Sequence, residues 1–192
     1  MRKLTLSDIK DLREYERERE AFRAEIVAAK KRRRIQLGDL MTIVFENAAT
    51  MRFQVQEMAR AERMLRDEQI AREIETFNDL IPADGELSGT LFIEITDDEA
   101  LRYWLPRLVG IHEHLHIVVG AAIVTGYAED VDRLTRPDTT STVHYLKFAF
   151  TPDQQQTFET APVRLVIDHP EYQVDVTLSD EQRDELVGDF AA

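Results

Sequence analysis

The chain of 192 residues contains no cysteine, which excludes several kinds of chemistry. Disulfides, a thiolate nucleophile, a cysteine-ligated iron–sulfur cluster and a thiolate zinc site all require that side chain. An excess of positive charge is also missing, because 37 acidic residues outweigh 24 basic ones and give a net charge of -13. Such a surface repels phosphate backbones, so we expect no nucleic acid among the partners.

Long apolar runs and the common catalytic motifs are missing as well. No stretch approaches the roughly 18 apolar residues that span a membrane, and residues 1–8 turn polar before a secretion signal could develop. We therefore expect a cytoplasmic protein that does not bind membranes. The sequence has no phosphate loop, dinucleotide fingerprint, Gly-x-Ser-x-Gly or His-Glu-x-x-His motif, so catalytic residues stay unknown and whether the protein is an enzyme stays open.

The first half of the chain is mainly helical in its pattern. A capping box at Thr5–Asp8 precedes a charged helical stretch to residue 31, and residues 35–38 are interpreted as a connector before a strand at 40–45. We favour one helix from Asn47 to Phe77 because residues 56–77 are strong helix formers, although residues 50–56 also alternate as a strand would. Pro82 cannot continue a helix, so the segment 78–82 ends it.

The second half alternates short strands with capped helices. The expected strands are 87–95, 112–119, 121–127, 142–150, 163–167 and 172–178, with helices after residues 96, 151 and 179 and a loop at 128–140. The pattern predicts a single α+β domain over 1–192. In it, an N-terminal helical layer (1–82) packs on a mostly antiparallel sheet with short capped helices (83–192).

Three of the five histidines fall at alternate positions, His112, His114 and His116. On a strand these side chains would share one face, where two or three imidazoles could bind a divalent transition metal such as Zn, Fe, Ni or Cu. The alternative is a row of solvent-facing polar residues on a two-faced sheet. His144 has the parity of an apolar face, which favours a hydrogen-bonded core residue over a ligand-binding one, and His169 before Pro170 is expected to shape a turn.

A second candidate site lies on the predicted helix at 47–77. Gln54, Glu57 and Arg60 follow one another at helical spacing and could line a ligand pocket that faces the sheet, or form a solvated face with a surface ion pair. The basic run at 30–34 ends the first helix. In so acidic a chain we interpret it as structural or partner-docking rather than as an anion site.

Six segments follow a recognisable order along the chain, namely Lys31-Arg32-Arg33-Arg34, Phe45-Glu46-Asn47, Gln54 to Glu62, Asn78-Asp79-Leu80-Ile81-Pro82, Val143-His144-Tyr145-Leu146 and Asp168-His169-Pro170-Glu171-Tyr172. In these segments the sequence resembles a bacterial family called domain of unknown function 3501, and the resemblance covers nearly the whole chain. It implies no established activity. Genes of the family often lie near those for rubrerythrin and iron–sulfur oxidoreductases, which implies a link to redox or peroxide-stress metabolism by association.

These observations lead to two hypotheses. The first is an accessory protein that binds a protein partner or a small ligand in redox or metal metabolism. The second is a small metal-binding protein or metalloenzyme that uses His112, His114 and His116. The cofactor is unknown, with a divalent transition metal as the candidate, and the oligomeric state is not predicted.

Overall fold

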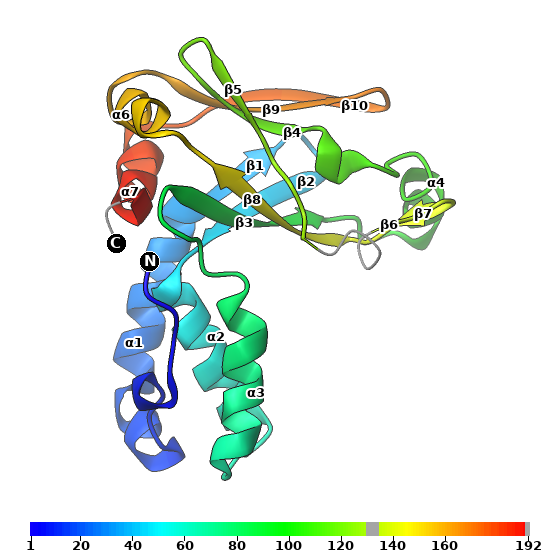
Figure 1. Cartoon of the computed structure of the whole chain (residues 1–192). Helices are drawn as coiled ribbons and strands as arrows, with labels where there is room; N and C mark the ends of the chain where they lie inside the picture. Colours follow the sequence, from blue (N-terminus) through cyan, green and yellow to red (C-terminus); the bar gives the residue numbers. More distant parts are fainter. Residues whose placement is uncertain (130–134, 191–192) are drawn as a thin grey trace.

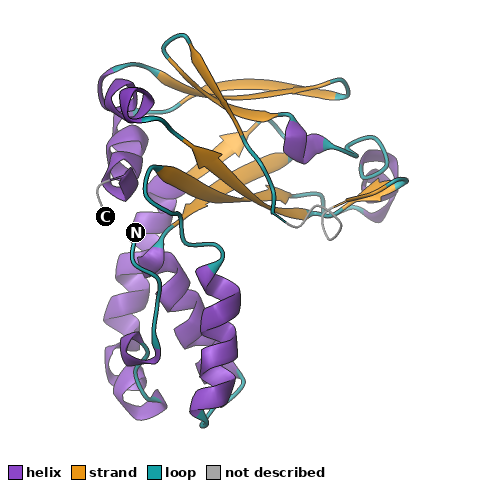
Figure 2. Ribbon diagram, in the orientation of Figure 1, coloured by secondary structure: helices purple, strands orange, loops and turns teal. Residues whose placement is uncertain are grey.

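The computed structural model describes residues 1–129 and 135–190, which form a helical arm and a sheet body (Figure 1). The arm contains the N-terminal segment with η1 (Leu6–Asp8), and the helices α1 (Leu12–Arg33), α2 (Ala48–Ala61) and α3 (Asp67–Asn78). Figure 2 shows these helices projecting away from the strands. A small apolar cluster holds the arm together, made of Leu4, Met51, Val55, Ile74 and Ile81.

The body is built from two four-stranded antiparallel sheets. The first has the order β1 (Arg34–Leu37), β2 (Met41–Glu46), β3 (Glu86–Ile93), β8 (Val143–Ala149). The second has the order β10 (Tyr172–Thr177), β9 (Val163–His169), β4 (Leu115–Val119), β5 (Ala122–Thr125). A short pair, β6 (Thr135–Arg136) and β7 (Thr139–Thr140), lies to one side.

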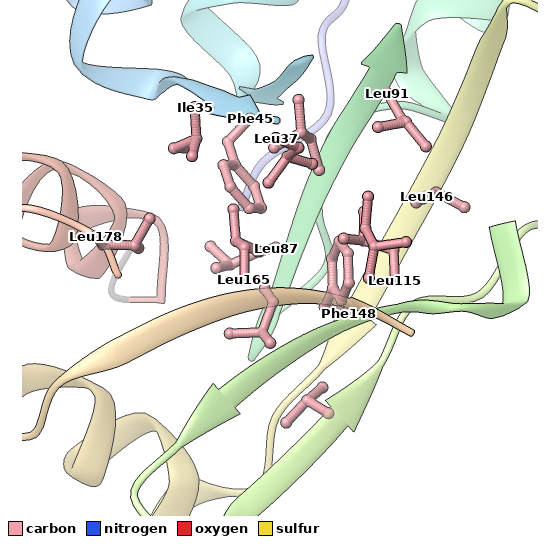
Figure 3. Packing of buried hydrophobic residues seen from close by; sticks show 14 of the residues in the cluster. Ile35, Leu37, Phe45, Leu87, Leu91, Leu115, Leu146, Phe148, Leu165 and Leu178 are labelled. Carbon is pink, nitrogen blue, oxygen red and sulfur yellow. The ribbon is translucent and has the colours of Figure 1, made fainter. Parts of the chain in front are cut away.

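The main core lies between the two sheets (Figure 3). Every second residue of each strand points into it, so Phe45, Leu87 and Phe148 from the first sheet pack with Leu115 and Leu165 from the second. Short helices close the ends of the body: α4 (Asp98–Trp104), η2 (Ile111–Glu113), α6 (Pro152–Thr160) and α7 (Asp180–Phe190). The expected α+β fold is confirmed, with two antiparallel sheets in place of one.

Arg33 joins the arm to the body. It ends α1 with a side chain that is 1% exposed, and its guanidinium donates to the carbonyl oxygens of Phe45 (2.8 Å) and Glu46 (3.4 Å). The same group pairs with Asp189 of α7 and lies 3.4 Å from the carboxylate of Glu185. The interpretation of the basic run as structural is therefore confirmed at Arg33.

Three predictions about the elements of the first half are wrong. The capping box at Thr5–Asp8 starts only the 3-10 turn η1, and α1 begins later with Asp11 as its cap. Residues 34–37 form β1 rather than a connector, because Ile35 and Leu37 are buried in the core.

The third wrong prediction is the single helix at 47–77, which is divided in two. Asn47 does cap α2, but α2 ends where Arg63 adopts a left-handed backbone (φ 52) and the amide of Met64 returns to the carbonyl of Ala59 (2.9 Å). Met64 is buried after this turn, and α3 starts anew at Asp67. Residues 50–56 are helical.

In the second half the predicted strands and helices are present, most of them with ends shifted by a few residues. The hairpin of β9 and β10 and the Pro152-initiated helix α6 are confirmed. Part of the predicted loop at 128–140 lies outside the described residues. Within the described ranges, no helix is both long and apolar enough to cross a membrane.

Candidate functional site

The five histidines of the chain come together from three separate segments. His112 lies on η2, His114 directly before β4 and His116 on β4, while His144 is the second residue of β8 and His169 ends β9. Strand pairing brings the segments of His116 and His169 together, because β4 lies beside β9 with His116 opposite Val166. We call these five side chains together with Asp168 the histidine cluster.

The inner part of the cluster is a buried pair of imidazoles. His112 is 3% exposed and His144 0% exposed, and their rings lie nearly parallel with centroids 5.9 Å apart. The Nε2 atom of His144 is 2.9 Å from the carbonyl oxygen of Ser141, which fixes the proton on that nitrogen, and 3.2 Å from the hydroxyl of Thr140. Neither ring nitrogen of His112, nor Nδ1 of His144, has a hydrogen-bond partner within the described residues.

Burial keeps both inner imidazoles neutral. It lowers the pKa of His144 to about 4, against the opposing effect of the Ser141 carbonyl, and nearby His112 lowers it further. Burial also lowers the pKa of His112, while the carboxylate of Glu113 acts in the opposite direction. That carboxylate lies 3.8 Å from Nε2 of His112, too far for a hydrogen bond.

The outer part of the cluster faces solvent and centres on Asp168. One oxygen of its carboxylate, Oδ1, lies 2.8 Å from Nδ1 of His114 and 3.1 Å from Nε2 of His116. Hydrogen bonds from His114, and then from His116, lower the pKa of Asp168. The other ring nitrogen of His116 is 3.0 Å from the hydroxyl of Thr125 on β5, which orients the ring.

His169 has the structural role that its position before Pro170 predicts. Its Nδ1 accepts a hydrogen bond from the amide of Glu171 (3.2 Å) within the β9–β10 turn. Its Nε2 is 3.2 Å from the carbonyl oxygen of Val109, which ties this turn to the segment before η2. The ring also packs edge-to-face against His114, with centroids 5.0 Å apart.

The prediction that His112, His114 and His116 share one strand face is wrong. Gly110 takes a left-handed backbone (φ 88), and the 3-10 turn that follows buries Ile111, so the strand begins only at Leu115. His112 therefore points inward toward His144, while His114 and His116 turn outward to Asp168. Across 1–129 and 135–190, no three His, Asp or Glu side chains are arranged around a point that a metal ion could occupy.

Two of the three residues of the expected pocket, Glu57 and Arg60, bond to α1 rather than line a pocket that faces the sheet. Glu57 accepts hydrogen bonds of 2.7 Å from the hydroxyl of Tyr15 and from two guanidinium nitrogens of Arg19, both on α1. Arg60 pairs with Glu16, which also lies on α1. These two side chains join α1 to α2, and a ligand-binding role for the three residues stays a prediction.

Asp168 is the member of the cluster that no sequence pattern pointed to. It belongs to a segment that carries the family resemblance, but which strand lies beside β9 cannot be read from local sequence. The alternation of histidines correctly predicted that His114 and His116 lie close together. The carboxylate that both approach, that of Asp168, comes from the neighbouring strand β9.

Comparison with known proteins gives a family without a known function. The family model described as "Protein of unknown function (DUF3501)" matches residues 3–190. The chain belongs to this family. A crystal structure of a novel protein of unknown function from Burkholderia pseudomallei K96243 is similar to this DUF3501 chain, with a TM-score of 0.89 and 30% sequence identity over 98% of this chain and 99% of that one. No curated protein matches.

Proposed function

We propose that this DUF3501 protein is an accessory protein that binds a divalent transition-metal ion through His114, His116 and Asp168. The observation that carries the proposal is the approach of two imidazole nitrogens to one carboxylate oxygen, at 2.8 and 3.1 Å. A place in redox, metal or peroxide-stress metabolism is supported only by the gene neighbourhood that the family resemblance implies.

The donor atoms and their surroundings suit such an ion. Imidazole nitrogen and carboxylate oxygen are ligands that zinc, iron and nickel share. In the structure Nε2 of His116 donates to Asp168, while Nδ1 lies 3.0 Å from the hydroxyl of Thr125. Moving the proton to Nδ1, which would then donate to Thr125, would free the Nε2 lone pair for an ion. The three side chains now bond to one another and do not surround a common point, so an ion would have to displace these hydrogen bonds and turn the side chain of Asp168. The side chain of Asp168 is 60% exposed, which leaves it room to rotate.

Three protein ligands would leave a coordination position open for water or for a group of another protein. An open position suits a carrier or a docking module, so metal binding is compatible with the role of an accessory protein. His112 does not belong to this ligand set, since its ring is buried on the other side of η2 against His144.

Isothermal titration of the untagged protein with Zn²⁺, and separately with Ni²⁺, tests the proposal. We expect one equivalent to bind the unaltered chain, and the double variant His114→Ala/His116→Ala and the single variant Asp168→Asn each to weaken affinity by about tenfold or more. Asp175→Asn is the matched control, because it removes a similarly exposed carboxylate on β10 that pairs with Arg164 and lies outside the proposed ligand set. An unaltered chain that binds neither ion, or variants that bind as it does, would refute the metal site.

The protein partner of the accessory hypothesis can be sought with the same variants. Pull-down from the native host, followed by identification of the captured proteins, should recover a redox or metal protein with the unaltered chain. Capture should decrease with His114→Ala/His116→Ala and persist with Asp175→Asn. Equal capture by all three chains would show that the captured partner does not bind at the histidine cluster.

A further inference from the structure

A cavity of about 440 Å³ lies on the outer face of the first sheet, between the end of α3 and β8. The residues that matter for its chemistry are Phe77, Leu80, Glu129, Val143, Tyr145 and Lys147. Its volume falls within the range of about 300–1,000 Å³ typical of small-molecule sites.

The two walls of this cavity are apolar. Phe77 and Leu80 form the wall at the end of α3, and Val143 and Tyr145 face them from β8. Tyr145 is 48% exposed, so a large aromatic surface stands open to solvent there. Covering this surface with an apolar ligand removes it from water, which favours binding.

A charged pair stands among the polar residues of the lining, which also include Thr76, Asp79, Ser88 and Ser141. The ammonium group of Lys147 lies 2.7 Å from the carboxylate of Glu129, and only 14% of the lysine side chain is exposed. This pair offers a donor and an acceptor side by side. An uncharged group that both donates and accepts can bond to both, whereas an ion would meet one like charge.

We propose that this cavity binds an uncharged organic molecule with an apolar body. The body lies between the end of α3 and β8, against Tyr145, and a polar end group such as an amide or a hydroxyl bonds to Lys147 and Glu129. The site is independent of the metal ligands, because none of His114, His116 and Asp168 lines it.

Fluorescence titration with three dyes of different charge tests both the place and the class of ligand. We expect neutral Nile red to bind, and anionic anilinonaphthalene sulfonate and cationic thioflavin T to bind more weakly. Tyr145→Ala should weaken Nile red binding by about tenfold, the effect of losing one buried aromatic contact. Tyr103→Ala is the matched control, since Tyr103 is 51% exposed and does not line the cavity.

The absence of cysteine allows a second readout. A bulky maleimide attached to Tyr145→Cys should block Nile red, while the same label on Tyr103→Cys should leave its binding unchanged. Both tyrosines are exposed, so thermal melting should show that all variants fold. No Nile red binding, or equal binding by the Tyr145 and Tyr103 variants, would overturn the site; tighter binding of either charged dye would overturn the uncharged class.

Discussion

The helical arm and the sheet body are stabilised by different kinds of interaction. The arm has a small apolar cluster, and ion pairs at the surface such as Arg60–Glu16 join its helices. The body has a continuous core between two sheets and buries polar side chains within it, among them His112 and His144. Surface pairs tolerate substitution because water replaces the lost partner, whereas a buried polar group has no such replacement. We therefore expect the body to respond more strongly to single changes and to pH.

The largest effect is expected where arm and body meet, at Arg33. Arg33→Met leaves the carboxylate of Asp189 buried without its charged partner, which should lower the free energy of unfolding by about 3–5 kcal/mol in urea denaturation. Arg34→Met is the control, because the pair of Arg34 with Glu94 is exposed and should contribute less than about 1 kcal/mol.

A double variant shows whether the uncompensated charge causes that loss. Arg33→Met combined with Asp189→Leu removes both charges, so stability should recover by a large part of the loss. Recovery stays incomplete because the carbonyl oxygens of Phe45 and Glu46 still lose their donor. A double variant as unstable as Arg33→Met would show that packing, and not the charge, is the cause.

The second effect is a pH dependence that belongs to the body alone. Burial holds the pKa of His144 at about 4, below its value of about 6.5 in the unfolded chain, so the unfolded state takes up the proton first. This contribution to stability is complete above pH 6.5 and is lost as the pH falls toward 4, by about 3 kcal/mol at most. His144→Gln, which keeps a donor for Ser141, should flatten the dependence over that range.

Hydrogen exchange at pH 7 and pH 5 locates the effect. After correction for the slower intrinsic exchange at the lower pH, amides of β8 should be less protected at pH 5 than at pH 7 in the unaltered chain, and should change less in His144→Gln. Amides of α1 and α2 serve as the internal reference, because no histidine lies on these helices. A pH dependence equal in both chains would assign it to His112 or to carboxylates instead.

The third effect is confined to the arm. Glu57→Gln replaces a half-buried carboxylate that accepts three hydrogen bonds from Tyr15 and Arg19, and should cost about 1–2 kcal/mol. Glu16→Gln, which weakens the exposed pair with Arg60, should cost less than about 1 kcal/mol. Hydrogen exchange should show faster opening of α1 and α2 with β3 and β8 unchanged. Loss of protection across the body would contradict the separation of the two regions.

The accuracy of the sequence predictions also differs between local and non-local features. Caps and turn residues act within a few positions, so Asn47, Pro152 and the β9–β10 turn around His169 were predicted correctly. The face that Glu57 presents depends on α1, a partner more than thirty residues away, and local spacing could not reveal it.

The same limit applies to the histidine cluster. Alternation correctly paired His114 with His116, because that relation spans two residues. The role of Asp168 required knowing that β9 lies beside β4, and the inward turn of His112 depends on Gly110 and on the burial of Ile111. The sequence could thus predict the outer imidazoles but neither their carboxylate nor the buried pair.

The smallest effect has the opposite sign and concerns the turn between α2 and α3. In the body, left-handed backbone angles occur at glycines such as Gly38 and Gly110, whereas in the arm Arg63 adopts one with a φ of 52. A side chain there costs about 1 kcal/mol relative to glycine, so Arg63→Gly should raise the stability of the arm by up to about 1 kcal/mol. Arg63→Ala keeps the Cβ atom and should change little, which makes it the control in the same urea denaturation. If both variants gained equally, the charge of Arg63 rather than its backbone would limit the arm.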